Sequence, residues 1–104
     1  HRAEVHCFIE QAQSMPSQSS TATFHYGISY GILLGALAAL DIPHTEVRPS
    51  KWKKALGLNS DKEASRLRAM QLFPHVDLHL KKHEGRSEAL LIGWYAKACF
   101  FKKA

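Results

Sequence analysis

The sequence predicts a small α/β domain in which two short strands flank a long helix and three more helices follow. Three observations lead to this fold class: a period-two alternation over residues 4–11, an apolar stretch with helical character up to residue 40, and repeated helix start and stop signals after residue 49. The chain of 104 residues is 45% hydrophobic and 22% charged, as in ordinary globular proteins. We expect one compact core and a single domain over residues 1–104.

The first strand is expected at residues 4–11 (EVHCFIEQ), where more apolar and less apolar side chains alternate. This assignment puts Glu10 at the C-terminal end of the strand. A loop rich in Ser, Thr and Gln follows, and Thr21 or Thr23 offers an N-cap for a helix from about Phe24 to Leu40.

The middle of this helix, residues 28–40, is the longest apolar stretch, and it is too short to span a bilayer. We therefore expect a buried helix of a soluble protein and no membrane association. Glycines at positions four apart fall on one face of a helix, which predicts close approach of another backbone there; they are Gly27, Gly31 and Gly35.

A second strand is expected within residues 42–49, which completes a β-α-β unit with the first strand and the long helix. Ser50 is the expected cap of a short helix that ends at Gly57, and the sequence from Ser60 to Glu63 has the pattern of a capping box. That box opens a helix that ends at Pro74. Residues 77–82 have no decisive pattern, and residues 84–101 form a final helix, so the order is β-α-β-α-α-α.

The charge is divided unevenly along the chain. Residues 1–50 carry two basic and four acidic side chains, whereas residues 51–104 carry twelve basic and five acidic ones, a net charge of +7 in a chain of +5 overall. A basic half of this kind is typical of proteins that neutralise phosphates, and a solvated basic surface is the alternative.

The sequence has no motif for several common kinds of site. Cys7 and Cys99 are isolated thiols without CxxC spacing, so neither a zinc ribbon nor a disulfide framework is indicated and a reducing compartment is favoured. There is no Gly-rich phosphate loop and no arrangement typical of a nucleophilic Ser or Cys, which leaves metal-assisted phosphodiester hydrolysis. The first residues run almost directly into a strand without a signal peptide, so the chain has the character of a fragment.

Three carboxylates are candidate Mg²⁺ ligands, because this hard cation prefers oxygen donors. Glu10 ends a strand, while Glu84 and Glu88 lie four residues apart at the start of the last helix and project from one face. The alternative is that the helical pair only interacts with the helix dipole and that Glu10 is a surface residue. A stripe of histidines would suit zinc if residues 75–83 were helical; its members are His75, His79 and His83.

A cluster of basic side chains around an aromatic residue has the composition of a surface that binds nucleic-acid backbone. Its members are Lys51, Lys53, Lys54, Lys62 and Arg66, with Trp52 between the first two. Trp52 taken alone suits the core of the domain as well as it suits a stacking platform.

Five blocks in this order resemble the phage, bacterial and organellar RuvC-like Holliday junction resolvases. They are FIEQ at 8–11, MPSQSSTATFHYGISYGILLGALAALDIP at 15–43, PSKWKKALGL at 49–58, DKEASRLRAMQLFP at 61–74 and LKKHEGRSEALLIGWYAK at 80–97. The resemblance implies an RNase H-like fold of RuvC type, a homodimer, and an endonuclease that nicks a four-way DNA junction with Mg²⁺, for which Mn²⁺ would substitute.

The resemblance also assigns the site. Glu10 matches the family's carboxylate on the central strand, and Glu88 matches the terminal acidic residue of the last helix. His83 and Glu84 stand where the family more often has Asp and His, so the additional ligand is open between them, and Glu84 has the better chemistry for Mg²⁺. Two metal ions would be held by Glu10, Glu84 and Glu88.

One departure concerns the start of the chain. The family's first strand, with an Asp that bridges both metals, is expected before His1, so the fold and the site are incomplete in these residues. A branched-DNA-binding relative that does not cut, or another nuclease or transposase-related domain with an RNase H-like fold, are the alternatives. We expect an intracellular protein of bacterial or phage-host cytoplasm or of a DNA-containing organelle.

Overall fold

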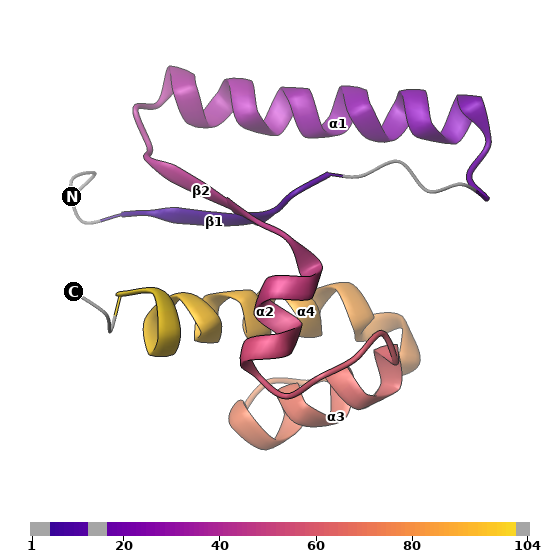
Figure 1. The fold of residues 1–104 in the computed structure, drawn as a ribbon, viewed down its shortest axis with the longest axis vertical. Helices are drawn as coiled ribbons and strands as arrows, with labels where there is room; N and C mark the ends of the chain where they lie inside the picture. Colours follow the sequence, from indigo (N-terminus) through magenta and orange to yellow (C-terminus); the bar gives the residue numbers. More distant parts are fainter. Residues whose placement is uncertain (1–4, 13–16, 102–104) are drawn as a thin grey trace. The chain divides into compact units, whose positions relative to one another are not determined.

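The computed structural model describes residues 5–12 and 17–101, which form a mixed α/β structure with a small two-stranded parallel sheet (Figure 1). The predicted α/β class is therefore confirmed. The chain divides into two compact units, His1–Glu46 and Val47–Ala104. The first unit contains a strand, a long helix and most of a second strand, and the second unit is helical.

The first unit is the expected β-α-β arrangement. Strand β1 (Cys7–Glu10) is followed by helix α1 (Ser20–Ala39) and strand β2 (His44–Val47), whose last residue begins the second unit. The two strands are neighbours in the sheet, and the amide of Cys7 donates a hydrogen bond of 2.9 Å to the carbonyl of Pro43. Within the described residues both strands are shorter than the predicted ranges 4–11 and 42–49; Glu4, the predicted start of the first strand, lies outside the described residues.

Helix α1 begins four residues before the position that its apolar pattern indicated. Ser19, rather than Thr21 or Thr23, is the N-cap, and its hydroxyl accepts a hydrogen bond of 3.1 Å from the amide of Ala22. The hydroxyl of Thr23 instead donates to the side chain of Gln18 at 3.3 Å. The helix ends before Asp41, which has a φ of 54° and turns the chain towards β2.

The prediction that α1 is buried was wrong. Leu37 is its only buried residue, and side chains such as Phe24 and Ile32 are 66% and 68% exposed. A Cβ added at any of the three glycines would meet nothing within 4 Å, so the predicted close approach of another backbone is absent from the described chain. By length and composition the 20-residue helix is apolar enough to cross a membrane, a test that core helices of soluble proteins also pass.

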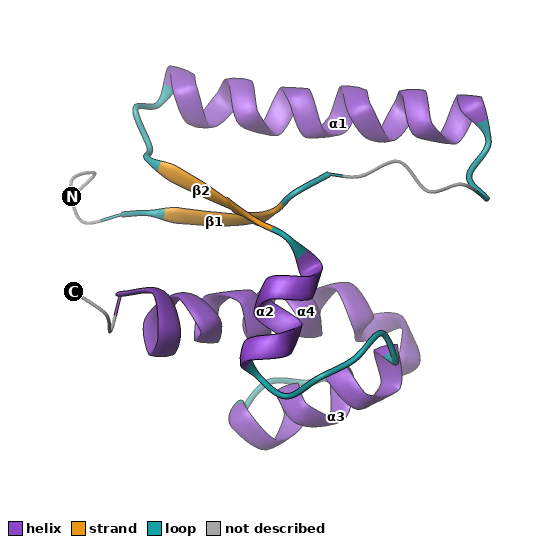
Figure 2. Ribbon diagram, in the orientation of Figure 1, coloured by secondary structure: helices purple, strands orange, loops and turns teal. Residues whose placement is uncertain are grey.

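The second unit contains three α-helices, α2 (Pro49–Ala55), α3 (Lys62–Leu72) and α4 (Glu84–Tyr95), coloured purple in Figure 2. The caps differ by one or two residues from those predicted. Pro49 occupies the first turn of α2 after an extended Arg48, so Ser50 does not cap this helix. Asp61, rather than Ser60, caps α3, because its carboxylate accepts a hydrogen bond of 3.0 Å from the amide of Glu63.

Small side chains let α3 and α4 pack closely. Ser65, Ala69 and Ser87 are each at most 1% exposed, and Leu91 fills the same buried region from α4. Trp52 of α2 is fully buried, which fits a core residue and not a stacking platform on the surface.

The last helix changes its hydrogen-bond pattern near its end. The 3-10 helix η2 (Lys81–His83) leads into α4, and α4 continues as the π-helix η3 (Ala96–Phe100). The predicted helix over residues 84–101 is therefore confirmed in extent and differs only in its final turns. Residues 74–80 are not helical, so the histidine stripe that could have suited zinc does not form.

Candidate functional site

The beginning of α4 positions two of the three predicted carboxylates. Glu84 is the first residue of the helix and Glu88 follows one turn later, both partly buried. The side chains of residues four apart in a helix are neighbours on one face, which agrees with the arrangement expected from the sequence. The sequence therefore placed this pair correctly on its helix.

Glu88 lies between two lysines from two other helices. Its carboxylate is 3.3 Å from Nζ of Lys62 in α3 and 3.9 Å from Nζ of Lys53 in α2. The side chains of Glu88 and Lys53 are both 17% exposed, so this pair is screened from solvent more than an ordinary surface pair. The structure thus joins a predicted metal ligand to two predicted phosphate contacts.

Arg66 has a different environment from the lysines. Its side chain is 10% exposed, and its guanidinium donates a hydrogen bond of 2.7 Å to the carbonyl of Leu78 and pairs with Glu63 one turn earlier. The bond to Glu63 raises the pKa of Arg66, and the charge of Glu84 adds to that effect. Arg66 therefore fastens α3 to the loop before α4, and it lies close enough to Glu84 to interact with it.

His83, the alternative to Glu84 as a ligand, is buried. Its Nδ1 accepts a hydrogen bond of 3.3 Å from the amide of Leu80, and its carbonyl accepts one of 2.9 Å from the hydroxyl of Ser87. Burial lowers the pKa of His83, and the charge of Arg86 acts in the same direction. These contacts are those of a residue that shapes the turn into α4, whereas Glu84 begins the helix with a partly exposed side chain.

Glu10 lies in the first unit, at the end of β1. The Cys7–Pro43 hydrogen bond sets Cys7 opposite His44, so the alternation of the strands puts Glu10 on one face and Glu46 on the other. Glu46 accepts a hydrogen bond from the hydroxyl of Tyr30 in α1. Glu10 is therefore on the opposite face of this sheet from Glu46 and its contact with Tyr30.

Within residues 5–12 and 17–101, no group of three or more His, Cys, Asp or Glu side chains converges to hold a metal ion. Glu84 and Glu88 form a pair in the second unit, and Glu10 belongs to the first. A pair of carboxylates still fits Mg²⁺, which is usually held by one or two carboxylates together with water and substrate phosphates.

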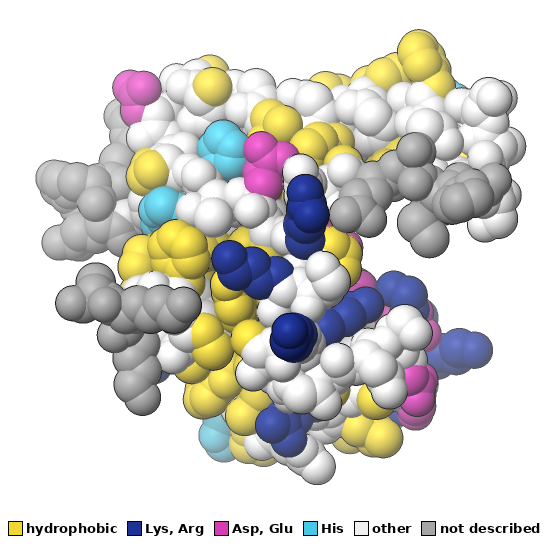
Figure 3. Space-filling model, viewed as in Figure 1, with side chains coloured by type: hydrophobic (Ala, Val, Ile, Leu, Met, Phe, Trp, Pro, Cys, Tyr) yellow, Lys and Arg dark blue, Asp and Glu magenta, His cyan; other side chains and the backbone are white. Residues whose placement is uncertain are grey.

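Basic side chains are confined to the second unit in the described chain. On the face drawn in Figure 3, Lys and Arg side chains lie over α2 and α3. The described residues of the first unit contain Asp and Glu but no Lys or Arg. Lys51 and Lys54, three residues apart on α2, are both exposed. Of the predicted phosphate contacts, these two and Lys62 are exposed, whereas Lys53 is partly buried and Arg66 is buried.

Several polar contacts were not anticipated from the sequence. The Glu63–Arg66 pair has the spacing of neighbours on a helix, and that spacing could have indicated it. The hydrogen bonds from Arg66 to Leu78 and from Arg86 to the carbonyl of Asp77, 3.0 Å long, reach backbone atoms of a loop. No sequence pattern marks a contact with a loop carbonyl.

Comparison with known protein families and with curated proteins finds no match for this chain. The resemblance to the junction resolvases rests on the five sequence blocks quoted above.

Proposed function

We propose that this chain is the metal-dependent nuclease domain of a RuvC-like Holliday junction resolvase, with an RNase H-like fold and a homodimeric assembly. The observation that supports this best is Glu88, whose shielded carboxylate lies at the start of α4 beside Lys53 and Lys62. A site that cuts a phosphodiester needs carboxylates for a cation and cations for the phosphate in one place. These three helices bring both kinds of group together.

In this proposal Glu84 and Glu88 hold Mg²⁺, and Glu10 is the further carboxylate that the sequence resemblance assigns to the site. The bound ion would polarise a phosphoryl oxygen and activate water, which is the chemistry that Mg²⁺ supplies in such enzymes. Lys62 would exchange its partner Glu88 for a phosphate oxygen, since its side chain is more than half exposed. Arg66 would act indirectly by holding the loop that leads into α4.

The exposed lysines of α2 would contact the phosphates of the junction arms. Lys51 and Lys54 are not paired with Glu88, and the second unit carries the whole positive excess of the described chain. Contacts of this type give affinity and orientation without reading sequence. The proposed partner, four-way junction DNA, would then be recognised by its shape and charge.

A second candidate function is binding of branched DNA without cleavage. The contacts of Glu88 favour it, because a carboxylate already neutralised by two lysines resembles a structural ion pair. This candidate requires the same basic surface but no metal at Glu84 and Glu88.

A cleavage assay on a labelled synthetic four-way junction distinguishes the two candidates. The full-length natural protein is incubated with Mg²⁺, and Glu10→Gln, Glu84→Gln and Glu88→Gln are compared with it. Loss of a metal ligand is expected to lower the cleavage rate by about a hundredfold or more, since even residues that only orient metal ligands are worth 10- to 100-fold. Junction binding in Ca²⁺ should persist in all three variants.

Asp41→Asn is the matched control, because it removes one carboxylate at an exposed turn whose φ of 54° Asn readily adopts. It should cut at the parental rate. Parental cleavage by Glu10→Gln or Glu88→Gln would contradict the nuclease assignment. Tight junction binding without cleavage by the parent would establish the second candidate instead.

A further inference from the structure

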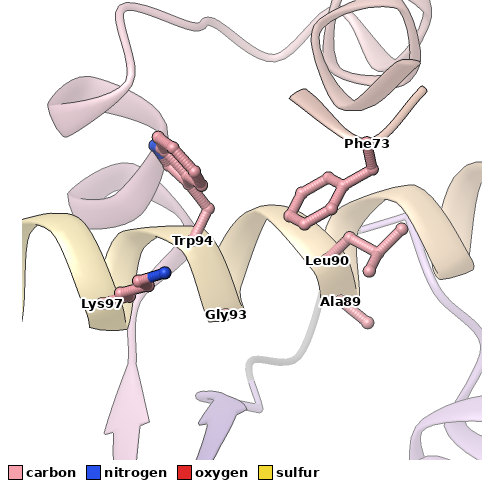
Figure 4. Close-up of a pocket in the computed structure, with 6 residues that line it drawn as sticks. All are labelled: Phe73, Ala89, Leu90, Gly93, Trp94 and Lys97. Atoms are coloured by element: carbon pink, nitrogen blue, oxygen red, sulfur yellow. The ribbon is translucent and has the colours of Figure 1, made fainter. Parts of the chain in front are cut away.

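The second unit contains an apolar pocket away from the carboxylates of α4. It has a volume of about 260 Å³ and is lined by Phe73 after α3 and by the later turns of α4; the α4 and η3 residues are Ala89, Leu90, Gly93, Trp94 and Lys97 (Figure 4). Pockets for drug-sized ligands usually measure roughly 300–1,000 Å³. This one therefore suits a single ring system and not a large cofactor.

Two aromatic rings form the walls of the pocket. The centroids of Phe73 and Trp94 are 6.3 Å apart and their planes meet at 89°, so the rings do not cover each other face to face. Gly93 precedes Trp94 on α4 and also lines the pocket, and a Cβ added there would meet nothing within 4 Å. The pocket thus offers an aromatic wall and open space above a glycine, an arrangement that accepts a flat group.

The charge at the pocket is positive. Among the described residues that line it, Lys97 is the only charged one, and Figure 4 shows its side chain directed across the helix surface near Gly93. Lys97 also belongs to the π-helix η3, which begins at Ala96. π-Helical turns are rare and occur frequently at functional sites, so this is a second observation that marks the same place.

We propose that this pocket receives one unpaired nucleobase, which stacks on Trp94 while Lys97 contacts an adjacent phosphate. Aromatic stacking beside a cation is how proteins bind single-stranded nucleic acid without sequence preference, and the unit has the net positive charge that such binding requires. The inference rests on the proposed function in one respect, because the unpaired base would come from the branch point of the bound DNA junction.

Binding of a fluorescein-labelled oligothymidine of six nucleotides to the full chain tests the pocket. Its affinity is compared with that of an oligomer of the same length in which the central sugars lack bases. We expect the oligothymidine to bind about tenfold more tightly, since stacking of one base has an effect of this order. The fluorescence of Trp94 should be quenched on binding, against a constant signal from the fully buried Trp52.

Two pairs of variants, each a test and its control, separate binding from folding. Gly93→Leu fills the open space and improves helix propensity, so it should fold well and lose the preference for the base-containing oligomer. Gly85→Leu, in the same helix and equally open, should bind like the parent. Lys97→Gln should lower the salt dependence of binding by about 0.7 in slope, and exposed Lys82→Gln should have no effect.

Equal affinity for the abasic oligomer, or unchanged affinity of Gly93→Leu, would overturn the inference. So would a concentration-dependent dimer that dissociates in Gly93→Leu, because the pocket would then be an interface between two copies. Junction cleavage is measured in the same variants. If the parent fails to bind junctions but prefers the base-containing oligomer, the proposed function fails and the pocket assignment stands.

Discussion

Nζ of Lys62 lies 3.3 Å from a carboxylate oxygen of Glu88, so a residue predicted to bind phosphate and one predicted to bind metal are each other's partners. The pair joins α3 to α4, and Lys53 from α2 approaches the same carboxylate at 3.9 Å. Binding of a phosphate and a cation at this place would have to exchange these ion pairs for new ones. In the absence of phosphate and metal, the ion pairs among Lys53, Lys62 and Glu88 therefore occupy the groups that would bind these ligands.

The Lys62–Glu88 pair should contribute little to stability. Because the Lys62 side chain is 55% exposed, a double-mutant cycle with Lys62→Met and Glu88→Gln is expected to give a coupling of about 0.5 kcal/mol. Urea denaturation monitored by circular dichroism measures it. A coupling of several kcal/mol would show that the pair is a structural element and would weaken the case for ligand exchange.

Arg66 should be more important for folding than its neighbour Arg68. Arg66→Ala removes the donor to the carbonyl of Leu78, a residue that is 1% exposed, and is expected to lower the free energy of unfolding by about 2 kcal/mol. Arg68→Ala, on the exposed side of α3, should change it by less than about 0.5 kcal/mol. Chemical denaturation of both variants checks this, and equal effects would contradict the structural role of Arg66.

The cap of α3 gives a comparison between two adjacent residues. Asp61→Ala should lower the free energy of unfolding by about 1 kcal/mol, because the amide of Glu63 loses its acceptor. Ser60→Ala should have almost no effect, although the sequence pattern made Ser60 the expected cap. Thermal and urea denaturation measure both losses. A larger loss of stability for Ser60→Ala than for Asp61→Ala would show that Ser60 is the cap and that α3 begins one residue earlier.

Tyr30 should titrate later than an ordinary tyrosine. Burial raises the pKa of Tyr30 from 10.0 to about 12, and its hydrogen bond to Glu46 adds to the shift. The folded state therefore keeps this proton after the unfolded state has lost it. The resulting stabilisation is complete below pH 10 and is lost as the pH rises through about 12.

An absorbance titration of tyrosinate tests this at high pH. The late transition should disappear in Tyr30→Phe and move to lower pH in Glu46→Gln. A late transition that survives Tyr30→Phe would assign it to another group.

Lys51 and Lys54 should determine part of the salt dependence of junction binding. The double variant with both residues changed to Gln is expected to reduce the slope of log K against log salt by about 1.8, since each phosphate contact contributes about 0.9. Fluorescence anisotropy at several salt concentrations gives the slope. The control is the same double change to Gln at Lys81 and Lys82, which are exposed in η2. An equal reduction in slope from this control would mean that the DNA does not bind preferentially at α2.

The order of elements could be predicted from the sequence because each depends on local signals. The alternation around Glu10, the apolar stretch of α1 and the turn residues before α2 and α3 are properties of neighbouring residues. The exact caps could not be predicted, since Ser19 and Asp61 compete with nearby Ser and Thr of similar propensity. The choice depends on which side chain reaches a free amide.

Burial could not be predicted in the same way. The apolar composition of α1 predicted a buried helix, but burial depends on what else packs on it, and in the described chain only Leu37 is covered. Conversely, the charge of Arg66 predicted an exposed side chain in contact with phosphate. In the structure this side chain is 10% exposed and binds Glu63 and the carbonyl of Leu78.

Local patterns in the chain are enough to specify an α/β protein with an acidic first half and a basic second half and to put Glu84 and Glu88 on one helix. Packing of the folded chain pairs Glu88 with Lys53 and Lys62 and buries His83. Helix spacing is a local property that the chain encodes directly. A contact between three helices depends on packing across distant residues, which no single segment of sequence specifies.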